Sequence, residues 1–394
     1  MVLKINIKKD LSIFIYILLL FFTFRIVNIS FISESLYSRG AQLSFLIICF
    51  LVLIKISRRE IKWNRLLVYI LAICMIMVLS TMLGEGSVRR TISQIYPLIG
   101  IYLLLNFLDK DELRKSLKGY AYLCFVFVVI NTIFCAFSLN ELFFGENTYV
   151  LGVKNQVAVI LIFVHLLFGV LDNGQDKIFS FLRLLNFIFS TYIIFNIRSG
   201  NNILAWCVLC CLIILKKIKF VSKISITTIF IAYIIFFVLI IEFHIQNLFA
   251  GLIVGILHKD LTFSLRTQIW DTVLVEIKNN PVLGYGIQDT SNAFQIVGMY
   301  NNGQFYNSTL SAHNTLLQTA YENGILIFIP IFLVILYTSK KVLSLEKNIW
   351  KIRVICAFCA LLIVMFAEAI QLIVLLDFCI LAISLKKLED ETMK

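Results

Sequence analysis

The stretch Gln156–Leu171, QVAVILIFVHLLFGVL, decides the fold class of this chain. It contains no Lys, Arg, Asp or Glu residue. A bilayer core of roughly 30 Å requires about 20 apolar residues per helix, so this stretch is a candidate membrane span near the lower length limit. Similar stretches recur along the chain, which is 60% hydrophobic with a mean hydropathy of +0.93. Soluble domains are far less apolar.

About twelve such stretches predict an all-α, polytopic membrane helix bundle. Lys4, Lys8 and Lys9 precede the first stretch, but no small-residue cleavage site follows it, so we interpret it as a retained helix and not as a signal peptide. The expected spans are Leu11–Ile29, Ala41–Ile56, Leu66–Leu83, Thr91–Leu108, Gly119–Leu139, Gln156–Leu171, Ile178–Ile197, Asn202–Leu215, Ile224–Ile241, Leu316–Tyr337, Ile352–Ala367 and Ala369–Leu385.

The basic residues predict how the bundle is oriented. If both termini are cytoplasmic, most of the 35 Lys and Arg residues fall in cytoplasmic segments, as the positive-inside rule requires. The net charge of +12 is therefore a signal of topology. Binding to nucleic acid requires a contiguous basic face, and the sequence contains none.

One long outer loop interrupts this pattern and predicts three regions. Residues 1–241 hold the first nine spans, 242–315 form the large extracytoplasmic loop, and 316–394 hold the last three spans and a cytoplasmic tail. Loops of this length are usually functional or disordered. Within the loop, Ser264–Gly286 reads as a helix that Ser264 caps and Pro281 stops, and His313–Glu322 reads as a second, short helix that ends at Gly324.

Arginine is frequent among the few outward cations, and its planar fork of donors suits phosphate. Arg198 precedes Gly200 at the start of a span, where free backbone N–H groups favour a diphosphate; a snorkelling side chain is the alternative. Arg89 and Arg90 begin another span and point in different directions, so one of them is expected to face the site. Pairing with Glu85 is the other interpretation.

His313 is the candidate base or anion ligand, because it lies in the outer loop with Asn314 beside it and Glu322 at helical distance. A structural role is the alternative for His313, and a simple surface charge is the alternative for Glu322. Arg266 and Trp270 share one flank of the predicted loop helix. Asn155 opens a span, where it is either a ligand-binding residue or a helix cap.

Several other chemistries are not expected. All ten Cys residues lie within predicted spans, so no disulfide framework is expected. Asp109-Lys110-Asp111 resembles a metal-binding pair, but acids followed by bases are what the start of a helix favours. No outward cluster has the spacing of metal ligands, so neither a metal nor a cofactor is expected. Arg25 and Asp377 lie within spans and are expected to be paired inside the bundle.

The order of residues in the outer loop resembles the bacterial O-antigen polymerase and ligase family. The resemblance also includes Asn155 at the start of a span and Arg198, although the order Arg198-Ser199-Gly200 differs from the family's Ser-Arg-Gly-like motif. These short motifs cover roughly a third of the chain. The loop residues that carry the resemblance are Arg266, Ile269, Trp270, Asn280, Pro281, Gly284, Gly286, His313, Asn314, Leu317 and Gly324.

The resemblance implies a glycosyltransferase of the GT-C type in the bacterial cytoplasmic membrane. Its donor would be an oligosaccharide on undecaprenyl diphosphate, and neither a sugar nucleotide nor a metal would be needed. Membrane lipids, a flippase and chain-length regulator proteins are the partners it implies. Taken together with the residue arguments above, the predicted catalytic residues are His313, Arg266 and Arg198, and the predicted substrate-binding residues are Arg89, Arg90, Asn155, Trp270, Asn314 and Glu322.

Several functions share these motifs. A polymerase of O-antigen, capsule or exopolysaccharide transfers the glycan to a lipid-linked repeat unit, whereas a ligase transfers it to lipid A core. Abundant Ile, Phe, Lys and Asn suggest an AT-rich gene, which favours a polymerase because low-GC Gram-positive bacteria have no lipid A core. A transporter or flippase of lipid-linked sugars would predict internal symmetry and more charge inside the membrane. A non-catalytic scaffold or sensor is a further alternative.

Overall fold

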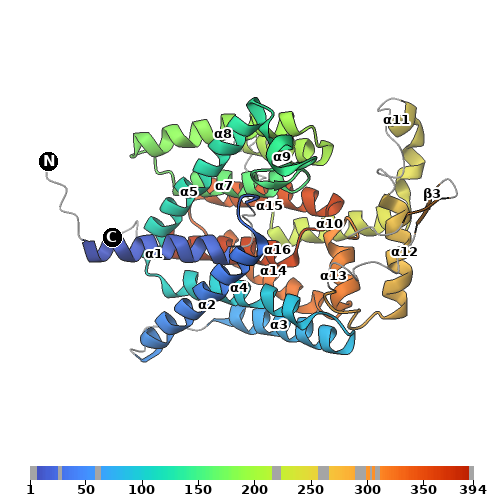
Figure 1. The fold of residues 1–394 in the computed structure, drawn as a ribbon, viewed down its shortest axis with the longest axis horizontal. Coiled ribbons are helices and arrows are strands. Elements are labelled where there is room, and N and C mark those ends of the chain that lie inside the picture. Colours follow the sequence, from blue (N-terminus) through green and yellow to red (C-terminus); the bar gives the residue numbers. More distant parts are fainter. Residues whose placement is uncertain are drawn as a thin grey trace.

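The computed structural model describes residues 7–24, 29–57, 64–214, 223–255, 266–288, 299–301, 304–306 and 311–389. Most of these residues form α-helices that pack side by side (Figure 1). The helices up to residue 214 are α1 (Ile7–Thr23), α2 (Glu34–Ser57), α3 (Arg65–Leu83), α4 (Val88–Phe107), α5 (Lys110–Ala136), α6 (Leu139–Phe144), α7 (Val157–Leu171), α8 (Lys177–Ile197) and α9 (Gly200–Ile214).

The rest of the chain contains further long helices and several short elements. Its helices are α10 (Ile226–Ile241), the 3-10 helix η3 (Ile245–Phe249), α11 (Ala250–Gly255), α12 (Arg266–Asn279), α13 (Thr315–Asn323), α14 (Phe328–Leu343), α15 (Asn348–Ala367) and α16 (Leu372–Glu389). Two antiparallel pairs join β1 (Thr148–Tyr149) to β2 (Gly152–Val153) and β3 (Met299–Asn301) to β4 (Gln304–Tyr306).

The helices confirm a multi-pass membrane protein. Five of them, α2, α3, α5, α8 and α15, are long and apolar enough to cross a membrane, and shorter apolar stretches lie in α1, α7, α9 and α10. Every predicted span contains a helix. The number of crossings, given above as about twelve, stays a prediction.

Burial separates central helices from peripheral ones. Nearly every residue of α7 and α16 is buried, whereas α2 and α8 leave rows of Leu and Phe exposed. Water would disfavour such surfaces, but lipid tails are as apolar as these side chains. Figure 1 shows α11 and α12 at the edge of the bundle, with α13 between α12 and the central helices.

Helix caps settle two interpretations of the sequence. Asp109 accepts a hydrogen bond from the Glu112 N–H at 2.8 Å, and Glu112 accepts one from the Asp109 N–H at 3.0 Å, so these acids begin α5 as predicted. The expected Asn155 cap is wrong, because α7 has Gln156 at its N-cap position and the Asn155 side chain is bonded to Ser199.

Of the two charged residues predicted within spans, Asp377 is buried in α16, whereas Arg25 lies outside the described residues. The predicted cap Ser264 also lies outside the described residues.

The predicted span Leu316–Tyr337 is two helices, because the chain breaks at Gly324. This residue has φ of 66°, in the left-handed region that favours glycine. A Cβ there would collide with the Val282 carbonyl, since the segment 281–286 runs beside the end of α13. Tyr285 N–H donates to the Tyr321 carbonyl at 2.9 Å, and Gly286 N–H donates to the Glu322 carbonyl at 2.8 Å. The short α13 is thereby separated from α14.

Candidate functional site

The N-terminus of α13 is fixed to the C-terminus of α15. The side-chain oxygen of Asn314 accepts from the N–H groups of Leu316 and Leu317 at 2.9 and 3.0 Å, as an N-cap residue does. Its amide donates to the Phe366 carbonyl at 2.8 Å, and the side chain is fully buried. Asn314 was predicted to bind substrate, but its amide oxygen and nitrogen are engaged in joining the two helices.

A carboxylate at the end of α15 contacts two of the predicted catalytic residues. The Glu368 side chain lies 2.5 Å from a guanidinium nitrogen of Arg266, which begins α12. Its other oxygen lies 3.7 Å from His313 Nδ1, immediately before the cap of α13. Three separate elements therefore converge on one carboxylate. We call Arg266, His313 and Glu368 the Glu368 group.

The Glu368 group combines a buried acid with accessible partners. The side chain of Glu368 is 7% exposed, whereas those of Arg266 and His313 are 20% and 35% exposed. Among the described residues, Arg266 makes no other side-chain hydrogen bond, and His313 Nδ1 makes none. The acid and His313 Nδ1 are thus held inside, whereas the other donors of the guanidinium and the exposed part of the imidazole remain available to a ligand.

The backbone around the Glu368 group holds it in place. His313 has φ of 45°, a left-handed conformation that non-glycine residues adopt rarely and that turns the chain sharply into α13. Thr315 Oγ1 donates to the Glu368 carbonyl at 2.9 Å and accepts from Ile370 N–H at 3.0 Å. These contacts fix the end of α15 and the start of the linker to α16.

Trp270 supports the Glu368 group from behind. Its side chain is 1% exposed, and its indole N–H donates to the Ala312 carbonyl at 3.1 Å. The ring also packs edge-on against Phe366, with centroids 5.7 Å apart. Trp270 was predicted to contact substrate, but in this structure it has no exposed face and instead joins α12 to α13 and α15.

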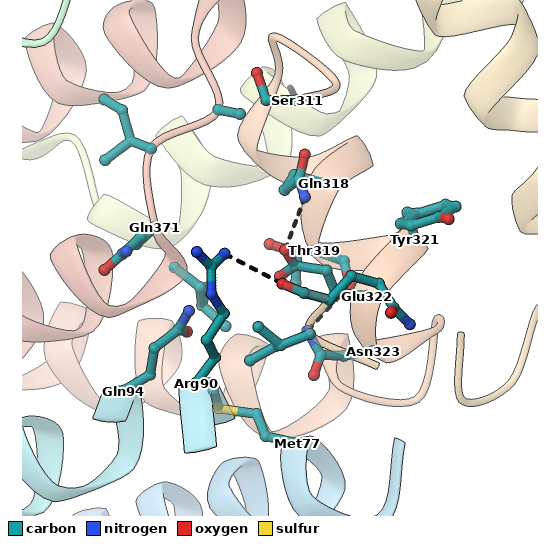
Figure 2. Close-up of a pocket in the computed structure, with 15 residues that line it drawn as sticks. Met77, Arg90, Gln94, Ser311, Gln318, Thr319, Tyr321, Glu322, Asn323 and Gln371 are labelled. Carbon is teal, nitrogen blue, oxygen red and sulfur yellow. Dashed lines mark hydrogen bonds between the residues drawn. The ribbon is translucent and has the colours of Figure 1, made fainter. Parts of the chain in front are cut away.

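A cavity of about 180 Å³ lies between α4, α13 and the linker from α15 to α16. We call it the Arg90 cavity, after the arginine whose guanidinium donates to the Gln288 carbonyl at 3.2 Å. Figure 2 shows Arg90 and Gln94 directed into it, with the Gln318 amide bonded to Glu322 at 2.7 Å, and Gln371 also borders it. Amide and charged groups line this cavity, so it suits a polar ligand.

Glu322 titrates unusually in this cavity. Removal of its carboxylate from water raises the pKa of Glu322 to about 7, against the opposing effects of the Gln318 hydrogen bond and the Arg90 charge. The Glu322 carboxyl group therefore changes charge near neutral pH.

Arg89 differs from its neighbour Arg90 because the Arg89 side chain is exposed and does not line the cavity. The two adjacent arginines therefore do point apart, as predicted.

Arg198 and Asn155 come together at the junction of α8 and α9. Arg198 is exposed at the C-terminus of α8 with φ of 53°, and the next residue, Ser199, donates to the Asn155 amide oxygen at 3.2 Å. Asn201 donates to the Val364 carbonyl of α15 at 3.3 Å. The junction of α8 and α9 therefore contacts α15 at Val364, four residues before Glu368. Within the described part of the chain, Arg198 itself contacts neither Arg266 nor His313.

Glu368 and Gln371 are the site residues that the sequence did not reveal. Both stand in the short segment AEAIQ, in which Glu368 separates the predicted spans Ile352–Ala367 and Ala369–Leu385 and Gln371 lies near the start of the second. An acid at a span junction that the basic residues place outside is the signal that could have identified Glu368. In the parts of the chain that the structure describes, no group of three His, Cys, Asp or Glu side chains could hold a metal ion.

The family comparison matches the segment that contains the predicted catalytic residues. Residues 185–332 match the family model described as O-antigen ligase. This segment includes Arg198, Arg266 and His313, whereas Arg90 and Glu368 lie outside it. Neither the curated proteins nor the solved structures gave a match to the chain. Residues 185–332 are therefore similar to the O-antigen ligase family model, which covers less than half of the chain.

Proposed function

We propose that the chain is a polysaccharide polymerase of the GT-C type. It would transfer a glycan from undecaprenyl diphosphate to a lipid-linked repeat unit and release undecaprenyl diphosphate. The observation that carries this proposal is the Glu368 group, in which one buried carboxylate contacts a cation and an imidazole at 2.5 and 3.7 Å. Such a transfer needs a cation for the departing diphosphate and a base for the attacking hydroxyl.

Arg266 is the proposed cation. When the bond between the anomeric carbon and the diphosphate oxygen breaks, negative charge grows on the diphosphate, and a preorganised guanidinium stabilises that charge most in the transition state. Glu368 holds one nitrogen of Arg266 and so orients the remaining donors without reorganisation. Arg198 and Arg90 are proposed to add positive charge at the same end of the bundle.

His313 is the proposed base. The acceptor hydroxyl oxygen attacks the anomeric carbon, and its proton passes to Nε2 of His313 as the carbon–diphosphate bond breaks. Glu368 faces Nδ1 and balances the charge of the imidazolium that forms. The 3.7 Å separation would shorten with substrate bound, as catalytic contacts often do. One displacement of this kind inverts the anomeric centre.

The proposed site opens on the extracytoplasmic side of a bacterial cytoplasmic membrane. The positive-inside pattern supports this placement, since most basic residues fall at the opposite ends of the predicted spans. Both termini are then cytoplasmic. A flippase that delivers the lipid-linked unit and a chain-length regulator are the proposed partners, and no metal or cofactor is proposed.

An O-antigen ligase is the second candidate, because the matching family model is described by that activity. It would use the same donor and the same Glu368 group but would deliver the glycan to lipid A core. The high content of Ile, Phe, Lys and Asn is typical of AT-rich genes, which are frequent in glycan clusters and in low-GC Gram-positive bacteria. A Gram-positive source would have no lipid A core, which favours the polymerase.

Cells that lack the chain, complemented with variants, test both functions. Arg266→Ala and Glu368→Gln are expected to lower polymer formation by about 10²- to 10³-fold, so that polymer ladders collapse to single repeat units on gels. Arg39→Ala removes an exposed cation of α2 and should leave the ladder unchanged. A ligase would instead leave full-length polymer on its carrier. A full ladder from an Arg266→Ala protein present at normal levels would contradict the assignment.

A further inference from the structure

A second, larger cavity lies beside the Arg90 cavity. It has a volume of about 510 Å³ and is bordered by α2, β1, the start of α7 and the linker from α15 to α16. This volume is within the roughly 300–1,000 Å³ typical of small-molecule sites. We call it the Glu34 cavity, after the acid of α2 that lines it. Much of its wall comes from residues before 185, which the family match does not cover.

One linker lines both cavities. Ala369, Ile370 and Gln371 border the Arg90 cavity and also the Glu34 cavity. The linker begins directly after Glu368, and Thr315 fixes it through hydrogen bonds of 2.9 and 3.0 Å. Two ligands, one in each cavity, would therefore approach each other across three residues that adjoin the Glu368 group.

The charges of the two cavities differ. Arg90 and the acid Glu322 line the first, so a cation accompanies its carboxylate, whereas Glu34 is the charged residue that lines the second, and no Lys or Arg lines it in the described ranges. A carboxylate repels a diphosphate, so the Glu34 cavity disfavours the leaving group of the donor. The same carboxylate accepts hydrogen bonds from hydroxyl groups or from an amino sugar.

Four of the polar side chains that line the Glu34 cavity are available to a ligand, whereas the hydroxyls of Ser30 and Tyr37 are bonded to backbone carbonyls. The side chains of Glu34, Thr148, Gln156 and Gln371 make no hydrogen bond to any other side chain or backbone group in the part of the chain that the structure describes. Apolar residues such as Leu151 and Val159 lie between them. Alternating amide, hydroxyl and aliphatic groups match the hydroxyls and the apolar ring faces of a sugar.

We propose that the Glu34 cavity binds the glycan of the acceptor, the lipid-linked repeat unit whose hydroxyl attacks. This inference rests on the proposed polymerase function and extends it by locating the second substrate. The donor diphosphate lies on the side of Arg266 and Arg90, and the acceptor sugar, which is neutral or bears an amino group, lies across the 369–371 linker. Its attacking hydroxyl then points toward the Glu368 group.

Kinetics with separated substrates test this location. A donor capped at its non-reducing end cannot accept, and a repeat unit joined to its lipid by a phosphonate cannot donate. Gln156→Ala and Glu34→Gln, purified in nanodiscs, should raise KM for the acceptor about 10-fold, the cost of one lost hydrogen bond to a sugar, and leave KM for the donor within about 2-fold. Arg90→Gln should show the reverse, and Glu146→Gln, an exposed acid outside both cavities, should change neither.

Equal effects of Gln156→Ala on both KM values, or no effect of Gln156→Ala and Glu34→Gln, would overturn the location. A photoreactive diazirine on the acceptor sugar gives a second measurement that needs neither variants nor turnover. Labels are expected in residues 30–37 and 148–160 of the wild-type chain, and labels confined to α12 and α13 would reject the proposal. Failure of the polymerase function itself is distinct, since the wild-type chain would then yield no product from any donor.

Discussion

At the scale of single residues, the Glu368 carboxylate carries an energetic cost that its partners offset. Moving a carboxylate out of water costs several kcal/mol unless opposite charge and hydrogen bonds compensate. Here the Arg266 guanidinium at 2.5 Å supplies opposite charge and a hydrogen bond. Replacing such a pair by apolar residues often does not destabilise a protein. The presence of the pair in an otherwise apolar bundle therefore favours a role in binding or catalysis.

Glu322 makes stability depend on pH. Its pKa is about 7 in the folded chain against an ordinary value of 4.5, so the folded state holds more protons between these values. Stability then falls as pH rises from about 5 to 8, by on the order of 1–3 kcal/mol. Apparent melting temperatures in detergent should decline over this range for the wild type. Glu322→Gln should flatten the decline, whereas Glu141→Gln, at an exposed site, should not. A flat wild-type profile would contradict the raised pKa.

At the scale of elements, α13 is a short helix that depends on both of its ends. Its nine residues are too few for stability in isolation. Asn314 fixes its N-terminus to α15, and the segment 281–286 presses on its C-terminus at Gly324. Both attachments also set where His313 and Glu322 lie. A small substitution at Gly324 should therefore displace His313 of the Glu368 group, although Gly324 does not contact that group.

Gly324→Ala tests this dependence. The added Cβ would meet the Val282 backbone and would also be strained by φ of 66°, so α13 or the 281–286 segment must shift. We expect a loss of about 1–3 kcal/mol in stability and a lower yield of folded protein. Gly145→Ala is the matched control, since Gly145 has φ of 80° but open space around it. Equal losses for both variants would mean that strain alone, and not the contact with Val282, decides the outcome.

At the scale of the whole molecule, the candidate site lies where helix ends from distant parts of the chain meet. The turn after α8 and the start of α13 both bond to the last two turns of α15, through Asn201 and Asn314. The 369–371 linker then extends this meeting point to both cavities. The site therefore exists only when the complete bundle is assembled.

Labelling of whole cells tests the orientation of the bundle. Glu146→Cys is expected to react with a membrane-impermeant maleimide in intact cells, because residue 146 is exposed in the predicted outer segment before α7. Asn173→Cys, exposed between α7 and α8, should react only after permeabilisation. The parent chain, which has ten free cysteines, measures the background. The opposite pattern would place the Glu368 group on the cytosolic side and remove the proposed reaction.

The sequence was sufficient for features that depend on local composition. Apolar stretches such as Gln156–Leu171 predict helices because each backbone polar group must be satisfied within the membrane. The helix containing Arg266 and the short helix that ends at Gly324 follow from periodicity and breaker residues, although the latter begins at Thr315 and not at the predicted His313. The similarity of residues 185–332 to the O-antigen ligase family model was also recognisable, because the motifs occur in order along one segment.

Only the tertiary structure decided which side chains meet. Nothing in the local sequence links Arg266 and His313 to Glu368. Arg266 and Glu368, for example, are 102 residues apart. Likewise, Trp270 and Asn314 are residue types suited to binding, but the Trp270 side chain is buried and the Asn314 side chain is bonded within the protein. The physical reason is that hydrophobicity and capping act between near neighbours, whereas pairing of charges and the placing of cavities depend on how the helices pack.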